Sequence, residues 1–174
     1  MKKSKKHEIK TARLVLREFT EEDCGAVVSL LMNDEIAKTY MIPELTDRRD
    51  AEKLFARLLE ISRMDDRIEY GIYRDGALVG FINDCGFDGD SAEIGYAVDP
   101  SHRGNGYAPE ALAAVINELF RMGYMRVVCG YFEGNRASRR VMEKCGMTPL
   151  DKEDMIEYRG ETHRCGYFEK TKTS

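Results

Sequence analysis

Residues 98–108 read VDPSHRGNGYA, and this stretch decides how the chain folds. The residues before it alternate as in a strand, and a long pattern with apolar residues at helical spacing follows it. Gly104 and Gly106 allow a sharp turn between the two. Such a turn aims several backbone N–H groups and the positive end of the helix dipole at one spot, which suits a phosphate. Arg103 adds a fixed positive charge, so we interpret the turn as an anion-binding site.

The periodicity on both sides of this turn predicts one mixed α/β domain, in the order β, α, α, β, β, β, α, β, α, β, β. We assign residues 1–10 to a basic, solvated tail, 11–170 to the domain and 171–174 to a C-terminal tail. Strands are expected near 11–17, 68–72, 77–82, 92–98, 125–132, 147–157 and 162–170; helices are expected at about 21–32, after Thr46, after the glycine turn, and at 136–145.

The composition is that of a globular protein. Its 174 residues suffice for one domain with a sizeable core, and 43% hydrophobic with 33% charged residues argue against wholesale disorder. The net charge of −4 gives no reason to expect a nucleic-acid partner. No apolar run approaches the ~20 residues that span a bilayer, and no apolar stretch of a secretory signal follows the basic start. We therefore expect a cytoplasmic protein without membrane association.

The cysteines and histidines give no sign of a metal centre or a disulfide framework. Five cysteines are an odd number and show no CxxC spacing, and the three histidines are scattered. Each cysteine stands among apolar neighbours, which is typical of a small core residue. We expect neither a metal nor disulfides.

Two stretches resemble the conserved motifs of a known family. Arg103, Gly106 and Ala108 fit the pattern Gln/Arg-x-x-Gly-x-Gly/Ala of motif A in the GCN5-related N-acetyltransferases, the GNAT family. Residues 135–147 resemble that family's second conserved helix. Together with RLVLR at 13–17, these stretches are similar to the RimJ/RimL-like subgroup, which acetylates N-terminal amines of ribosomal proteins. The resemblance covers residues 11–170.

The resemblance implies a fold and an activity. The fold would be a single domain with a mostly antiparallel sheet flanked by helices. The activity would be transfer of the acetyl group of acetyl-CoA to a primary amine, first of all a protein or peptide N-terminal α-amine, by direct attack in a ternary complex. A small-molecule amine as acceptor and a non-catalytic acyl-CoA-binding module are the alternatives. A nucleotide-binding protein is disfavoured, because the chain has no Gly-x-x-x-x-Gly-Lys-Ser/Thr run.

The resemblance also assigns the cofactor site. The turn would hold the pyrophosphate of acetyl-CoA on backbone N–H groups, and the pantetheine arm would pair with the main chain of strand 94–98. Asn135, an N-cap by residue type, would also approach this arm. The cofactor-binding residues are then Tyr96, Val98, Arg103, Gly104, Asn105, Gly106, Tyr107, Ala108 and Asn135.

For catalysis the residues leave alternatives open. A protonated amine needs a base or a water relay before it attacks, and Glu157 and Glu93 are the candidates. Ser138 would give or relay a proton to the departing thiolate. Many family members use a tyrosine for this step, and the helix expected at 136–145 contains none. Residues 40–43 would line the acceptor side, and the protein would be a monomer or a homodimer.

Overall fold

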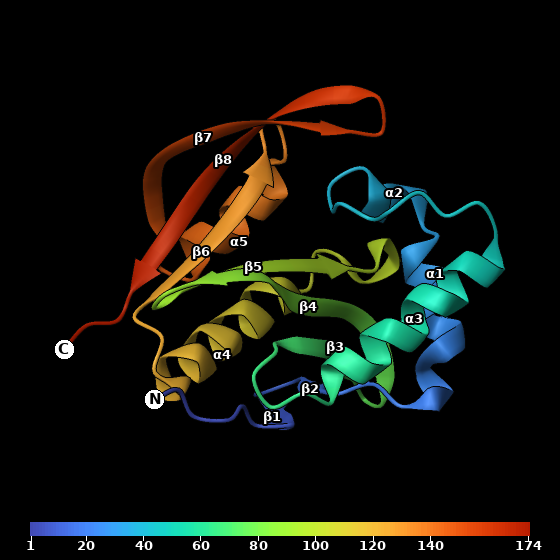
Figure 1. Cartoon of the computed structure of the whole chain (residues 1–174), viewed down its shortest axis with the longest axis horizontal. Helices are drawn as coiled ribbons and strands as arrows, with labels where there is room; N and C mark the ends of the chain where they lie inside the picture. Colours follow the sequence, from blue (N-terminus) through green and yellow to red (C-terminus); the bar gives the residue numbers. More distant parts are fainter.

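All eight strands join one sheet, in the order β1-β2-β3-β4-β5-β6-β8-β7 (Figure 1). The computed structural model describes all 174 residues, Met1–Ser174. Neighbouring strands are antiparallel except β5 and β6, which are parallel. The strands are β1 Glu8–Lys10, β2 Val15–Arg17, β3 Glu69–Arg74, β4 Ala77–Asp88, β5 Ser91–Val98, β6 Arg126–Phe132, β7 Thr148–Tyr158 and β8 Glu161–Thr171.

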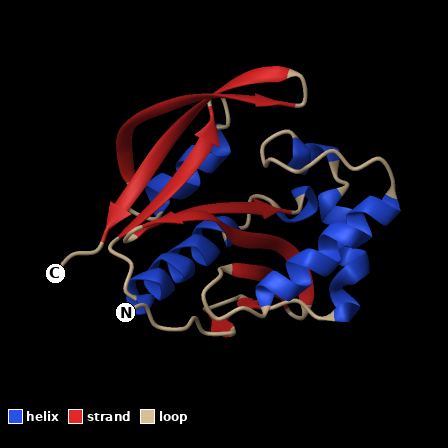
Figure 2. Cartoon of the chain, in the orientation of Figure 1, coloured by secondary structure: helices blue, strands red, loops and turns tan.

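Helices cover both faces of this sheet (Figure 2). The largest cluster of buried side chains lies between the sheet and helices α4 and α5, and a second cluster lies between the sheet and α1 to α3. The helices are α1 Cys24–Leu31, α2 Asp34–Ala37, α3 Arg48–Ser62, α4 Tyr107–Met122 and α5 Arg136–Lys144, with short 3-10 turns η1 at Glu21–Asp23 and η2 at Pro100–His102. The expected mixed α/β fold with a mostly antiparallel sheet is confirmed.

The sheet splits between its two parallel strands. β5 and β6 pair only where Ser91–Glu93 lies beside Arg126–Val128. Beyond that point the strands diverge, with β6 turning away beside β8 (Figure 1). The outer edge of β5 from Ile94 to Val98 is therefore left without a partner strand. This opening lies directly before the glycine turn.

The turns and caps follow the local sequence. Thr20 caps η1 with a capping box, and Gly146 takes the left-handed conformation after α5, at φ 72°. Asp75 and Arg159 have φ near 50° in the two-residue turns that close the β3–β4 and β7–β8 hairpins. None of the helices has the length and apolarity that crossing a membrane requires.

The N-terminal segment differs from the expected solvated tail. Residues 8–10 form strand β1, which pairs with β2. Lys5 is 4% exposed, and its Nζ donates a hydrogen bond of 2.7 Å to the carbonyl of Ser62. Lys2 Nζ donates to the carbonyl of Gly123 at 2.8 Å. A basic run is solvated only when the folded chain offers its ammonium groups no hydrogen-bond acceptors. Here backbone carbonyls from distant parts of the chain accept from Lys2 and Lys5, so the expectation of a solvated tail is wrong.

Two other boundaries also differ. The first strand begins at Val15 rather than near residue 11, because Thr11 turns the chain by bonding its backbone N–H to the carbonyl of Leu14. Helix α2 was not expected. Asn33 caps its start by accepting hydrogen bonds from the backbone N–H groups of Glu35 and Ile36. The helix has only four residues, too few to show a helical pattern in the sequence.

Candidate active site

The glycine turn forms a cradle of unpaired backbone donors at the start of α4. Gly104 and Gly106 have φ near 80°, a conformation that glycine adopts without strain. Pro109 in the first helical turn has no N–H to offer. None of the N–H groups from Gly104 to Ala108 donates a hydrogen bond within the protein. The predicted anion site therefore has both the donors and the helix dipole that it needs.

Arg13 holds this cradle in place, which sequence reasoning did not detect. Its Nη1 donates to the carbonyl of Asn105 at 2.7 Å, and its guanidinium pairs with the Glu110 carboxylate at 2.8 Å. The same guanidinium lies 4.9 Å from the ring centre of Tyr107. A Cβ atom on Gly106 would come within 3.3 Å of Arg13 Nη2. Arg13 and Asn105 are 92 residues apart, so no local pattern in the sequence indicates this contact.

The unpaired edge of β5 presents main-chain groups to the opening. The N–H of Asp99 donates to the carbonyl of Val79 on the β4 side. Because main-chain groups alternate along a strand, Ala97 and Gly95 also point toward β4. The main-chain groups of Tyr96 and Val98 then point into the opening. The sequence reasoning had selected these two residues.

Ser138 and Tyr96 meet across the opening. Their hydroxyl oxygens lie 2.9 Å apart, and the Tyr96 hydroxyl also donates to the Ser138 carbonyl at 3.1 Å. Asn135 caps α5, since its side-chain oxygen accepts from the Ser138 N–H at 3.2 Å. Burial raises the pKa of the Tyr96 phenol, so the phenol stays protonated at neutral pH. Tyr96 on β5 thus places a tyrosine hydroxyl against α5, which contains no tyrosine of its own.

Glu93 and Glu157 lie in different surroundings. Glu93 is the last residue of β5 that pairs with β6, and it shares a sheet face with Gly95 at the start of the opening. Glu157 is exposed near the tip of the β7–β8 hairpin. Its neighbour Tyr158 faces the other way, and the Tyr158 hydroxyl donates to the carbonyl of Ala37 at 2.8 Å. Of the two carboxylates, only Glu93 lies at the opening between β5 and β6.

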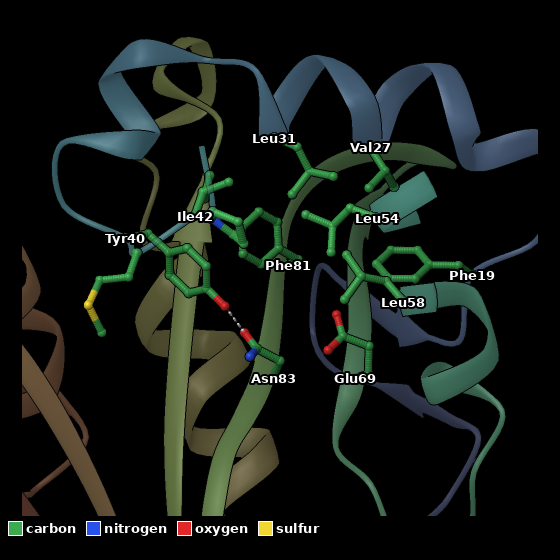
Figure 3. A pocket seen from close by; sticks show the side chains of 12 residues that line it. Phe19, Val27, Leu31, Tyr40, Ile42, Leu54, Leu58, Glu69, Phe81 and Asn83 are labelled. Carbon is green, nitrogen blue, oxygen red and sulfur yellow. Dashed lines mark hydrogen bonds between the residues drawn. The ribbon is translucent and has the colours of Figure 1, made fainter. Parts of the chain in front are cut away.

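The segment expected at the acceptor side lines an apolar cavity between α1, α3 and the sheet (Figure 3). Its volume is about 100 Å³. Tyr40 forms the wall nearest β5, and its hydroxyl donates to the side-chain oxygen of Asn83 at 2.5 Å. The lining consists of Phe19, Val27, Leu31, Tyr40, Met41, Ile42, Pro43, Leu54, Leu58, Glu69, Phe81 and Asn83.

Glu69 is the one charged residue of that lining. Its side chain is almost wholly buried, with the residue 5% exposed, and its carboxylate has neither a hydrogen bond nor an ion pair within the protein. Burial, and next the negative charge of Asp84, raise the pKa of Glu69 to about 8, although Lys5 and Arg67 act in the opposite direction. In the sequence Glu69 stands beside Tyr70 at the start of a strand, and no pattern there distinguished it from a solvated strand residue.

We expect Glu69 to make the folded protein less stable as the pH rises. Between about pH 4.5 and about pH 8 the folded protein holds a proton that the unfolded chain has released. The free energy of unfolding therefore falls as pH rises through this window, by up to about 1.4 kcal/mol per pH unit. Glu69→Gln should remove this slope, which urea denaturation at pH 5, 6.5 and 8 measures. Glu60→Gln, an exposed carboxylate on α3, should keep it; equal slopes for the Glu69→Gln variant and the unchanged protein would contradict the prediction.

Comparison with known proteins gives the family of this chain. The family model described as "Acetyltransferase (GNAT) domain" matches residues 13–148. A Bacillus subtilis (strain 168) protein named Uncharacterized N-acetyltransferase YoaA is 30% identical over 146 residues, 79% of this chain and 81% of that protein. Cradle, split sheet and relatives together define an acetyl-CoA-dependent transferase. The chain belongs to the GNAT acetyltransferase family.

Solved structures share the fold over nearly the whole chain. An acetyltransferase (GNAT family) from Bacillus anthracis has a TM-score of 0.81 at 25% identity, covering 94% of this chain and 98% of that one. RimL, a ribosomal L7/L12 alpha-N-protein acetyltransferase in complex with coenzyme A, has a TM-score of 0.83 at 21% identity, covering 94% and 97%. The second likeness concerns the fold alone.

The residues of the turn fit the pyrophosphate of coenzyme A. A pyrophosphate needs donors in close array and a backbone without side chains between it and the ligand. The free N–H groups of the cradle supply the donors, and Gly104 and Gly106 supply the close approach. No group of three or more His, Cys, Asp or Glu side chains stands in an arrangement that could hold a metal ion.

Proposed function

We propose that this acetyltransferase acetylates the α-amine of a protein or peptide N-terminus, by direct attack in a ternary complex. The observation that carries the proposal is the unpaired edge of β5, which joins the cradle to the Glu93 side of the sheet. The fold shared with RimL, whose name gives an alpha-N-protein acceptor, supports this acceptor class.

The main chain would hold the donor. Acetyl-CoA supplies an acetyl thioester when it is bound. The N–H groups of residues 104–108 would bind its pyrophosphate, and the outward main-chain groups of Tyr96 and Val98 would pair with its pantetheine arm. An N–H on this edge can also stabilise negative charge on the thioester oxygen during attack. Asn135 would approach the arm from the start of α5.

Glu93 would take the proton from the attacking amine, directly or through a water molecule. Its place at the start of the opening supports this role over Glu157, which is exposed on the hairpin. Burial raises the pKa of the Cys129 and Cys145 thiols, so neither forms the thiolate that an acetyl-cysteine intermediate requires. These thiols favour direct transfer to the amine.

Ser138 would give a proton to the departing thiolate. If the Tyr96 hydroxyl turns its single proton from the Ser138 carbonyl to Ser138 Oγ, the serine proton is free to point into the opening. The raised pKa of Tyr96 keeps the phenol protonated for this purpose. Tyr96 is then a positioning residue that acts through Ser138.

Tyr96→Phe should lower kcat by about 10-fold, less than the ~100-fold or more that a strong general acid gives, because a thiol of pKa near ~8.5 is already a fair leaving group. The KM for acetyl-CoA should change little. Steady-state kinetics of Tyr96→Phe, Ser138→Ala and the double variant measure the effect. The double variant should be no slower than Ser138→Ala alone; fully multiplied losses would show that the two hydroxyls act independently.

The test of the acceptor class is release of free CoA thiol from acetyl-CoA across a panel of peptides, polyamines, amino acids and aminoglycosides. Acetylation of peptide α-amines well above the other classes is the expected result. Preference for a small-molecule amine would replace the proposal with that acceptor. Binding of acetyl-CoA without turnover on any amine would favour a non-catalytic module.

A further inference from the structure

The cavity beside β4 contains one polar group that the protein itself leaves without a partner. Glu69 lies at the end of the cavity away from Val27 and Leu31 (Figure 3). Its cross-strand neighbour Asn83 makes no hydrogen bond to it: the Asn83 oxygen accepts from Tyr40, and the Asn83 nitrogen donates to the carbonyl of Asp84 at 3.0 Å. Glu69 is only 5% exposed as a residue, and a carboxyl group in such a place is costly without a donor. The arrangement therefore calls for a donor from outside the chain.

A row of residues leads from this carboxyl to the opening. Glu69 on β3 is paired with Asn83 on β4, and Asn83 is paired with Gly95 on β5. Directly paired residues share a sheet face, and neighbouring strands lie ~4.8 Å apart, so Glu69 and Gly95 are separated by about 10 Å along the sheet. The Tyr40 ring covers Gly95 at the β5 end of this row, 3.1 Å from where a Cβ would lie, and so forms the wall between the cavity and the opening.

The chemistry of the walls selects the ligand. Phe19, Leu54, Leu58 and Phe81 surround the carboxyl with apolar surface, which favours a hydrocarbon stem. The carboxyl at the end favours a nitrogen that donates hydrogen bonds, above all an ammonium group. An anion would meet only repulsion there. The volume of about 100 Å³ suits one aliphatic chain rather than a folded peptide.

We propose that this cavity is an acceptor subsite that binds an alkylammonium group of the substrate, with Glu69 as the specificity-determining residue. This inference rests on the proposed acetylation of an amine at the opening. The amine that is acetylated lies near Gly95, and a short hydrocarbon stem carries the second nitrogen past the Tyr40 ring to Glu69. For a peptide acceptor, the side chain of the first residue enters the cavity, so lysine is preferred over apolar residues of the same length.

Two matched pairs of acceptors test the subsite. One pair is 1,5-diaminopentane against pentylamine, and the other is a tetrapeptide with N-terminal lysine against the same peptide with norleucine. Each pair keeps the stem and differs in the terminal nitrogen. We expect the unchanged protein to favour the nitrogen-bearing member at least 10-fold in kcat/KM. A ratio near one in either pair that the protein acetylates would overturn the proposal without any variant.

Variants then assign the preference to Glu69. Glu69→Gln should reduce the ratio to about two or less, chiefly by raising the KM of the nitrogen-bearing acceptor. Glu60→Gln removes an equal charge from the exposed face of α3 and should leave the ratio unchanged. Loss of the preference in Glu60→Gln, or its survival in Glu69→Gln, would mean that general attraction to the acidic protein causes it.

The pH profile separates binding from a structural role. Asp84, Lys5 and Arg67 are the charged groups that act on Glu69, and a bound ammonium group adds a positive charge beside it. Binding should therefore release a proton near pH 7, and the preference should grow between pH 6.5 and 8.5. A pH-independent preference would contradict the role of Glu69.

The two proposals fail in different ways. If no peptide is acetylated but 1,5-diaminopentane is strongly preferred over pentylamine, the peptide acceptor is wrong and the subsite stands. If peptides are acetylated with lysine and norleucine equal, the subsite is wrong and the peptide acceptor stands.

Discussion

Gly106→Glu is expected to abolish the rise in melting temperature that acetyl-CoA produces. At 100 times its Kd a ligand adds about 2.7 kcal/mol to stability, which for a chain of this size raises the melting temperature by roughly 5–10 °C. The new carboxylate would occupy the cradle, repel the pyrophosphate and displace Arg13, whose Nη2 lies 3.3 Å from the Cβ position. Differential scanning fluorimetry with and without acetyl-CoA measures the shift.

The variant itself should still fold. A side chain at φ 78° costs roughly 1–2 kcal/mol, which a domain with this core tolerates. Gly89→Glu is the matched control: φ is 57°, the Cβ position is open, and the turn lies at the opposite end of β5 from the cradle. It should keep the full acetyl-CoA shift. A normal rise in melting temperature with acetyl-CoA in Gly106→Glu would contradict the assignment of the pyrophosphate to this turn.

Glu93→Gln should lower turnover by about 100-fold or more, the usual contribution of a general base. The amide cannot accept the amine proton, and its size is almost that of the carboxyl, so the strand pairing with Val128 is retained. Acetyl-CoA should still raise the melting temperature, since the cradle is untouched. The loss should be greatest at low pH, where less of the amine is already neutral, and smallest near the pKa of the acceptor.

Glu157→Gln gives the comparison for this result. Its carboxylate is exposed on the hairpin, so we expect turnover within about threefold of the unchanged protein. A large loss of turnover in Glu157→Gln, with normal turnover in Glu93→Gln, would mean that Glu157 on the hairpin is the general base. Small losses in both variants would leave a water relay as the route for the proton.

Local sequence predicted the elements of the fold where local forces decide them. The turn at Gly104 and Gly106, the N-cap at Asn135 and the hairpin turn at Gly160 each follow from the conformational range or side chain of the residue itself. The N-terminal strand could not be predicted in this way. The strand pairs with Val15–Arg17 close by, but the basic segment before it is held by distant partners. Lys5 donates to the carbonyl of Ser62, 57 residues away, and no periodicity in a basic run indicates such a partner.

The candidate site likewise contains some features that the local sequence could predict and others that it could not. Tyr96 and Val98 could be selected because their strand precedes the turn, and the register of the strand decides which main-chain groups point outward. The pairing of Tyr96 with Ser138 could not, since forty-two residues separate them. The isolation of Glu69 also cannot be read from the sequence, because it depends on the side chain of Asn83 bonding to Tyr40 and to the carbonyl of Asp84 instead.

The split sheet bears on how the protein avoids aggregation through an exposed strand edge. An unpaired strand edge is a template on which a second chain can add, and most proteins protect such edges from aggregation. Here the unpaired edge lies inside the molecule, with β6 on the far side and the Tyr96–Ser138 contact bridging to α5. A strand with side chains on both faces would collide with that bridge, whereas a thin pantetheine arm carries none. The protein can thus keep a strand edge ready for its ligand without offering it to its neighbours.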